Sequence, residues 1–353
     1  MMTIASKSIF NLLRLLWLQI FKQTTMSSEQ QTAPTLPSMK DAYKFLKLVP
    51  NPDGTLTRPD IPSVPTSPDQ TLYRDIPLNP KNATFIRLYR PSAAPPNSKL
   101  PIVVYFHGGG FVIVSATSSF IHEFCTEIAE QASALVASLE YRLAPEHRLP
   151  AAYEDGVEAI SWVKTQATID GEDGACEPWM KQYADFSRVF VMGGSAGGNL
   201  VYHACLRALD LDLQPLKIVA LVMNQPFFGG IRRTESELKF FDNHVIPLHA
   251  TDLLWSLALP EDTDRGHEYC DPTTKGSSDG NIGRLPVCLV RGYAGDPLID
   301  KQKEFAKMLD SRGVHVIGQW IDGGHHGVEI YDPVVARALY HDFKDFICSF
   351  QAA

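Results

Sequence analysis

The sequence predicts an α/β protein whose mostly parallel sheet is covered by helices on both faces. From about residue 100 onward, short aliphatic runs alternate with longer segments of helical pattern. The short runs are apolar almost throughout, as expected of strands buried on both faces. The predicted strands cover residues 102–106, 134–139, 189–192, 218–223, 287–290 and 314–317, and the predicted helices cover 118–133, 152–168, 197–208, 300–311 and 334–349.

The first third of the chain has a different pattern. Fourteen of the 25 prolines lie between Pro34 and Pro101. Proline lacks an N–H group and fixes φ, so this region cannot form a long helix or a central strand. We expect it to wrap over the domain, with a short helix at 41–48 and one or two edge strands, such as 84–89.

Composition narrows the possible functions. The chain has 353 residues, of which 44% are hydrophobic and 20% charged, a mixture typical of globular proteins. The formal net charge of −8 and the lack of a long basic run argue against a nucleic-acid partner. The six cysteines show no C-x-x-C pair or metal-ligand spacing, so we expect reduced thiols and no metal or cofactor.

Residues 1–37 are predicted to be an N-terminal extension of the domain. Residues 9–21 are largely apolar and carry one charge, Arg14. A helix of this length rises about 20 Å, short of the roughly 30 Å hydrocarbon core, so we expect no membrane span. Three interpretations stay open: a segment that lies on a membrane surface, a disordered extension upstream of Met26, or a secretory signal, for which no clear cleavage site follows. We expect a cytoplasmic protein, with endomembrane association as the alternative.

A glycine-rich turn connects the predicted strand 189–192 to the helix 197–208. Its sequence, GGSAG at residues 193–197, matches the G-x-S-x-G pattern that exposes a nucleophilic serine at a strand–turn–helix junction. The pattern alone also marks ordinary glycine turns, but the flanking strand and helix favour the catalytic interpretation. Ser195 is therefore the candidate nucleophile.

A second glycine run, HGGG at residues 107–110, follows the first strand of the alternating region. Three glycines after a buried strand leave their amides free to face an anion. We expect Gly108 and Gly109, with the amide of Ala196, to form an oxyanion hole. The alternative, a phosphate-binding loop, lacks the lysine that a P-loop needs. His107 is expected to hold the loop rather than react.

A serine hydroxyl needs a base to take its proton. Asp296 follows the predicted strand 287–290, and His325 and His326 follow the last predicted strand. The carboxyl ends of parallel strands meet at one sheet edge, so these loops can converge with Ser195. The order Ser, Asp, His is that of a catalytic triad on this type of sheet.

Alternatives exist for both partners of the serine. Asp300 and Asp322 lie near Asp296 and His326 in the chain, although Asp300 is expected in the first turn of a helix. Spacing alone does not separate His325 from His326.

With these residues placed, the chain resembles the plant carboxylesterases, in the hormone-sensitive-lipase-like branch of the α/β hydrolases, over about residues 43–350. The motifs that carry the resemblance are YFHGGGF (105–111), EYRLAPEHRLPAAYED (140–155), GGSAGGN (193–199), NQPFFGG (224–230) and GDPLID (295–300). The resemblance implies an α/β-hydrolase fold and favours His326, because the family's histidine precedes a small residue. One departure is Gly194, where relatives commonly have aspartate.

The resemblance also implies a single domain over residues 38–353 with a cap from about 39–49 and 227–279. The cap aromatics Phe227, Phe228 and Trp255 are candidates for an apolar substrate pocket, and the alternative is that they form the core of the cap. The block at 140–155 is expected to support the site through charge pairs of Glu140, Arg142 and Glu146.

Together these features predict a serine carboxylic-ester hydrolase that acts on small, largely apolar esters, such as plant metabolite or xenobiotic esters. Two alternatives stay open: a dehydratase, lyase or cyclase of specialised metabolism that uses the same site, and a hormone-binding receptor. The related gibberellin receptors lack the catalytic histidine, whereas His326 is present here. Sequence alone gives no oligomeric state.

Overall fold

The computed structural model describes residues 38–66, 72–94, 98–169, 176–274, 276 and 280–350. The strands are β1 (Val49–Pro50), β2 (Leu56–Thr57), β3 (Tyr73–Asn79), β4 (Thr84–Tyr89), β5 (Leu100–Phe106), β6 (Leu135–Glu140), β7 (Ala184–Gly194), β8 (Ile218–Asn224), β9 (Val287–Tyr293) and β10 (Val316–Ile321). The helices are α2 (Met39–Leu46), α3 (Ser119–Gln131), α4 (Ala151–Thr168), α5 (Pro178–Tyr183), α6 (Ala196–Ala208), α7 (Glu235–Lys239), α8 (Leu248–Ala258), α9 (Ile299–Ser311), α10 (Val328–Tyr331) and α11 (Pro333–Ser349), with a 3₁₀ turn at Ile282–Arg284.

Eight strands form one sheet in the order β10-β9-β8-β7-β5-β6-β4-β3. The six strands from β10 to β6 pair in parallel, whereas β4 pairs antiparallel with both β6 and β3. The predicted class, a mostly parallel α/β sheet, is therefore confirmed. The predicted edge strand at 84–89 is β4, which lies one strand in from the edge, between β6 and β3. The edge strand itself, β3, was not located from the sequence, because YRDIPLN is polar and only partly buried.

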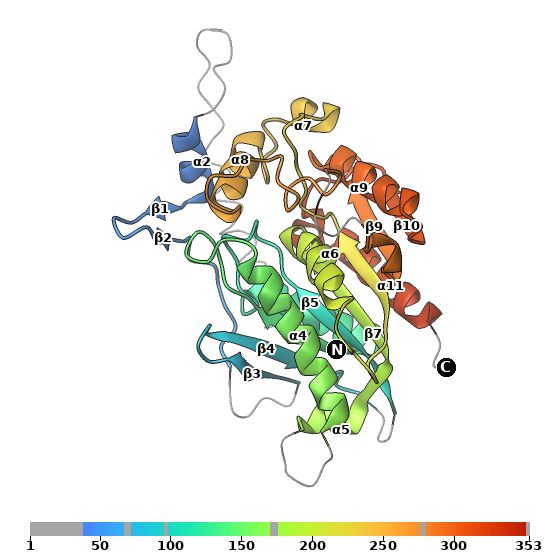
Figure 1. The fold of residues 1–353 in the computed structure, drawn as a ribbon. Helices are drawn as coiled ribbons and strands as arrows, with labels where there is room; N and C mark the ends of the chain where they lie inside the picture. The colour runs from blue at the N-terminus through green and yellow to red at the C-terminus, as the bar shows by residue number, and fades with distance from the viewer. Residues whose placement is uncertain are drawn as a thin grey trace.

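Helices cover the sheet on both faces (Figure 1). On one face α4 and α6 pack over the central strands and α9 over β9, and their apolar residues join the larger core cluster. On the other face α3 and α11 pack together over a second cluster that includes Phe190, Phe343 and Leu289. The central strands are buried on both faces because each face has its own helical layer.

The segment after β8 and the N-terminal helix meet above the sheet. Helix α2 packs against α8, and the two lie side by side at the top of Figure 1, near α7. Ser38 begins α2 with a capping box, since its hydroxyl accepts from Asp41 N while the Asp41 carboxylate accepts from Ser38 N. Segments about 200 residues apart in the chain are thereby joined over the same end of the sheet.

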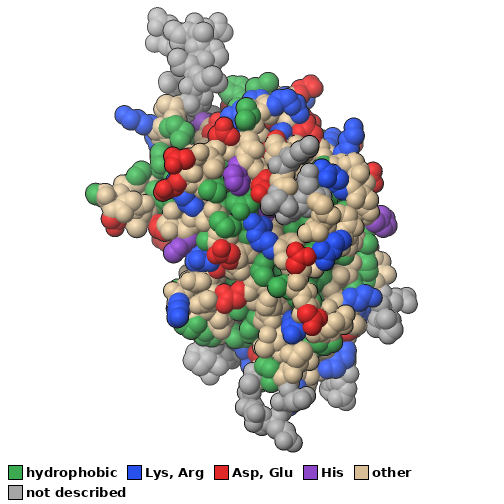
Figure 2. Space-filling model, in the orientation of Figure 1, with side chains coloured by type: hydrophobic (Ala, Val, Ile, Leu, Met, Phe, Trp, Pro, Cys, Tyr) green, Lys and Arg blue, Asp and Glu red, His purple; other side chains and the backbone are tan. Residues whose placement is uncertain are grey.

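Acidic and basic side chains are interspersed over the face shown in Figure 2. Within the described ranges, no helix is both long and apolar enough to cross a membrane. The apolar stretch at 9–21, and with it the predicted N-terminal extension 1–37, lies outside the described residues.

Candidate active site

Ser195 occupies a sharp turn between β7 and α6. Its backbone has φ 53° and ψ −120°, a conformation that a residue with a Cβ atom rarely adopts. Two glycines make the turn possible. A Cβ atom at Gly197 would lie 1.9 Å from the carbonyl oxygen of Phe106, and one at Gly193 would lie 2.3 Å from that of Gly197. Backbone hydrogen bonds to the last residue of β8 and to the segment after it hold the partly exposed serine.

The structure brings Ser195, His326 and Asp296 into one hydrogen-bonded row. His326 Nε2 lies 2.9 Å from Ser195 Oγ, and His326 Nδ1 lies 2.8 Å from Asp296 Oδ2. Asp296 is fully buried, and its carboxylate also accepts from Leu298 N at 2.9 Å and from Gln302 Nε2 at 2.9 Å. These donors fix the carboxylate so that it faces the imidazole.

The surroundings of His326 determine its pKa. Burial disfavours the charged ring and lowers the pKa. The charge of Asp296, the hydrogen bond to it and the charge of Glu329 outweigh burial, so the pKa of His326 lies above the ordinary histidine value. The ring therefore binds a second proton more readily than an ordinary histidine does.

The two alternative acids and the neighbouring histidine have other partners or surroundings. Asp300 lies in the first turn of α9, where its carboxylate accepts from Ser236 N at 2.8 Å. Asp322 is exposed. The ring of His325 packs edge-on against that of His244, with centroids 4.6 Å apart. Of these residues, His326 is the one placed between the serine and a carboxylate.

The HGGG loop lies directly against the serine. A Cβ atom at Gly108 would lie 3.3 Å from the Cβ atom of Ser195. Gly109 has φ 105°, and a Cβ atom there would lie 1.9 Å from the carbonyl oxygen of Ile113, so only glycine fits. Within the described part of the chain, the amides of Gly108, Gly109 and Ala196 donate to no other protein group. Unused amides beside a serine are suited to binding an oxyanion.

His107 holds the HGGG loop in place through its buried ring. Its ring is buried, stacks on Tyr141 with centroids 4.1 Å apart, and places Nδ1 2.8 Å from the carbonyl oxygen of Gly108. Burial lowers the pKa of His107 to about 4, so the ring is neutral at physiological pH. Tyr141 donates its hydroxyl proton to the carbonyl oxygen of His107 at 2.9 Å.

Arg142 and Glu146 of the 140–155 block form the predicted charge pairs, whereas Glu140 pairs with no lysine or arginine in the described residues and binds neutral donors instead. Arg142 donates to the buried carboxylate of Asp155 at 2.7 Å, which ties the segment after β6 to α4. Glu146 pairs with Arg58 of the N-terminal wrap. Glu140 accepts from Ser115 Oγ and Ala116 N in the segment that follows the HGGG loop.

The three cap aromatics proposed for a substrate pocket are fully buried. Phe227, Phe228 and Trp255 are each no more than 1% exposed and belong to the main core cluster. The rings of Phe227 and Trp255 stack in parallel, with centroids 4.5 Å apart. Phe227 N also donates to the carbonyl oxygen of Ser195 at 2.9 Å, which joins this packing to the turn that carries Ser195. Their surroundings match the alternative role, as core of the cap.

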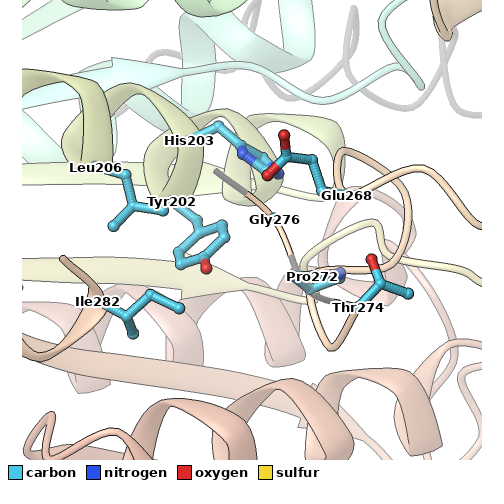
Figure 3. A pocket seen from close by; sticks show the side chains of 8 residues that line it. All are labelled: Tyr202, His203, Leu206, Glu268, Pro272, Thr274, Gly276 and Ile282. Carbon is cyan, nitrogen blue, oxygen red and sulfur yellow. The ribbon is translucent and has the colours of Figure 1, made fainter. Parts of the chain in front are cut away.

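A small hollow lies further along α6, between Tyr202, His203 and the segment that carries Glu268 and Thr274 (Figure 3). His203 is about two helical turns from Ser195 along α6. Its ring stacks on Tyr153, and burial, above all, lowers its pKa well below the ordinary value. These contacts show that His203 packs in the interior beside α4.

Gln302 is a part of the site that the sequence did not reveal. It lies six residues after Asp296, on the face of α9 that turns toward the carboxylate. A buried polar residue at helical spacing from a candidate acid is the signal that could have indicated it. In the described residues, all six cysteines are free thiols and no group of three or more His, Cys, Asp or Glu side chains could hold a metal ion.

Comparison with known proteins places the chain in a family. A family model for the alpha/beta hydrolase fold matches residues 103–330. The solved structure of an esterase from Pyrobaculum calidifontis is 25% identical, with a TM-score of 0.66 over 95% of this chain and 97% of that one. The chain therefore belongs to the alpha/beta hydrolase fold family, and the predicted fold is confirmed.

Plant relatives define its branch and activity. The chain is 49% identical to probable carboxylesterase 8 of Arabidopsis thaliana, over 89% of this chain and 95% of that protein. It is 46% identical to a 3-O-acetylpapaveroxine carboxylesterase of Papaver somniferum, over 88% and 98%. Both the plant carboxylesterase branch and the enzyme class, a carboxylic-ester hydrolase, are thus confirmed.

Proposed function

We propose that the chain hydrolyses small carboxylic esters through a covalent acyl-enzyme on Ser195, with His326 as the base and Asp296 as its orienting acid. The observation that carries the proposal is the row Ser195 Oγ–His326 Nε2 at 2.9 Å and His326 Nδ1–Asp296 Oδ2 at 2.8 Å. The carboxylate of Asp296 accepts a hydrogen bond from His326 Nδ1, so the single proton of the neutral imidazole is on Nδ1. His326 Nε2 is then free to accept a hydrogen bond from Ser195 Oγ.

In the first step His326 takes the hydroxyl proton while Ser195 Oγ attacks the ester carbonyl carbon. The carbonyl oxygen becomes an oxyanion, which the amides of Gly108, Gly109 and Ala196 stabilise. His326 then gives its proton to the leaving alcohol, and the acyl group stays on Ser195. A water molecule repeats the sequence, releases the acid and restores the serine.

The charge that develops on His326 is matched by its surroundings. Asp296 stabilises the imidazolium without taking its proton, since its oxygens are already held by Leu298 N and Gln302 Nε2. His107 stays neutral in its buried place and therefore adds no competing charge. A carboxylate beside His326 and a neutral His107 under the glycine loop are what an acyl-transfer site requires.

We propose small, largely apolar esters as the substrate class. The oxyanion loop is bordered by apolar side chains, since Leu254 of α8 lies against Gly110 and Phe111 is buried beside it. One relative is named as a carboxylesterase of 3-O-acetylpapaveroxine, which is an O-acetyl compound. Short acyl esters of plant metabolites or xenobiotics are therefore the first substrates to test.

The experiment compares turnover of p-nitrophenyl acetate, butyrate and octanoate by the wild type and Ser195→Ala. We expect Ser195→Ala to lose more than about 10³-fold in kcat, with acid and alcohol as the products of the wild type. Retained turnover in Ser195→Ala would contradict the proposal. A hydroxylated plant metabolite tested in parallel separates the alternative, because loss of water from that compound without release of acid and alcohol would favour a dehydratase or lyase instead.

We also propose that residues 38–353 form one domain whose cap consists of 39–49 and 227–279. The packing of α2 on α8 supports this division. Cytoplasmic location, or membrane-surface association through residues 9–21, stays a proposal that fractionation of the full chain and of a variant starting at Met26 would test.

A further inference from the structure

A buried amide and a carboxylate connect the loop of His326 to the end of β8. Gln225 Nε2 donates to both carboxylate oxygens of Glu329 at 2.9 Å each. Gln225 Oε1 accepts from Gly327 N at 2.9 Å. Asn224 Nδ2 also donates to Glu329, at 2.6 Å. One glutamine side chain therefore binds the residue directly after His326 and the residue three positions after it.

Asn224 and Gln225, which are adjacent in the chain, also bind the backbone around the nucleophile. The carbonyl oxygen of Asn224 accepts from Ser195 N at 2.9 Å, and Gln225 N donates to the carbonyl oxygen of Arg291 at 2.7 Å. Asn224 and Gln225 are 5% and 2% exposed. Contacts to the serine turn, to β9 and to the histidine loop thus originate from two adjacent residues.

The histidine loop needs such an anchor. Three glycines of this loop have positive φ: Gly323, Gly324 and Gly327. Because glycine has no side chain, these residues make no side-chain contacts that could fix the loop backbone. Gln225 itself has φ 50°, a disfavoured conformation for a residue with a Cβ atom. Gln225 is buried and its side-chain amide makes three hydrogen bonds. These bonds hold the residue in its strained backbone conformation.

We propose that Gln225 and Glu329 act as positioning residues, which hold the ring of His326 within hydrogen-bonding distance of Ser195 and place a second negative charge beside it. The proposal rests on the proposed triad. It adds that the geometry of the triad depends on a side-chain clamp, here named the Gln225–Glu329 clamp, which comprises those two residues and Gly327 N.

The charge of Glu329 has a direct consequence for the proton on His326. Burial lowers the pKa of His326, while the Asp296 charge and hydrogen bond and then the Glu329 charge raise it. Besides His326, Glu329 interacts electrostatically with four phenols, and burial above all raises the pKa of each, so they are neutral: Tyr105 of β5, Tyr293 of β9, Tyr331 of α10 and Tyr340 of α11. Arg291 is engaged by Tyr293 and Asp342, and His325, next to His326, packs on His244.

The first test is Glu329→Gln, which keeps the shape of a partly buried side chain and removes its charge. We expect kcat to fall about tenfold with KM within about twofold, and the acidic midpoint of kcat/KM against pH to move down. The matched control is Asp322→Asn, which removes an exposed charge from the same loop and should leave both the rate and the midpoint unchanged.

The second test is Gln225→Met, which conserves volume and removes all three amide hydrogen bonds. We expect kcat to fall about 10- to 100-fold, as a small displacement of a catalytic group would cause. The double variant should lose no more than the worse single variant, because both act through one clamp. Far-UV circular dichroism and the thermal midpoint of each variant report folding, and if Gln225→Met does not fold, Glu329→Gln decides.

The proposal is overturned if Glu329→Gln folds and keeps both wild-type kcat and the wild-type pH midpoint, or if it changes KM alone. The two levels of the account fail separately. If Ser195→Ala is inactive while both clamp variants stay fully active, the clamp is wrong and the triad stands. If Ser195→Ala is active, the triad itself is wrong.

Discussion

His326 Nε2 lies 2.9 Å from Ser195 Oγ, although 131 positions separate the two residues in the chain. The sheet makes this contact possible. Ser195 follows β7, Asp296 follows β9 and His326 follows β10, and these strands are parallel and close in the order β10-β9-β8-β7. Their carboxyl ends therefore deliver three loops to one edge.

The rate of ester hydrolysis should rise with pH through a single midpoint above the ordinary histidine value of about 6.5. The base must be neutral to accept the serine proton. Since the pKa of His326 is raised, protonated enzyme persists to a higher pH and activity is lost as pH falls below that midpoint. Measurement of kcat/KM for a p-nitrophenyl ester from pH 5 to 9 tests this, and a flat profile would contradict it.

Asp296→Asn should lower kcat by about 10⁴-fold while the fold persists. An amide that keeps its hydrogen bond with Leu298 N turns its NH₂ group toward His326 Nδ1, which favours the ring tautomer that cannot accept from Ser195. Asp300→Asn is the matched control, because it alters a carboxylate four residues later that binds Ser236 N instead. Comparable rate losses in both variants would argue against the role of Asp296.

Gly108→Ala should lower kcat by about 10- to 100-fold with little change in KM. The added methyl group would lie 3.1 Å from the carbonyl oxygen of Gly194 and 3.3 Å from Ser195 Cβ, so the amide must move away from the oxyanion position. Gly280→Ala is the control, since a Cβ atom there meets no atom within 4 Å. Steady-state kinetics of both variants, with thermal midpoints, would reveal a general loss of folding.

The parallel sheet and the loops that carry the triad were predictable because they depend on local sequence. Buried strands read as continuous apolar runs, and the catalytic turn needs glycine at positions where a Cβ atom would meet the backbone. The last strand was predicted at 314–317 but runs Val316–Ile321. Its residues alternate between partly buried and exposed at the sheet edge, so the apolar run ends before the strand does.

The supports of the site were harder to predict because they are tertiary contacts between polar residues. Gln302 reaches Asp296 from the next helix, and Gln225 reaches Glu329 over 104 positions. Nothing in the local pattern distinguishes these side chains from exposed ones. The choice between His325 and His326 came from the family resemblance, since spacing could not provide it.

Trp255→Ala should destabilise the protein by about 3–5 kcal/mol, and should lower the thermal midpoint by roughly 10 °C. Trp255 is fully buried and stacks on Phe227, so its removal leaves a cavity in the cap. Trp320→Ala, at a position 38% exposed, should shift the midpoint by no more than about 2 °C. A change in preference between acetate and octanoate esters without loss of stability would instead assign Trp255 to the substrate pocket.

The central claim is tested most directly by locating the covalent intermediate. Wild-type enzyme incubated with a fluorophosphonate and digested should carry one adduct, on the peptide that contains Ser195, detected by mass spectrometry. Ser195→Ala should carry none, and His326→Ala should react at least about 10³-fold more slowly. An adduct on another residue, or wild-type ester hydrolysis that continues when Ser195 is fully labelled, would contradict the account.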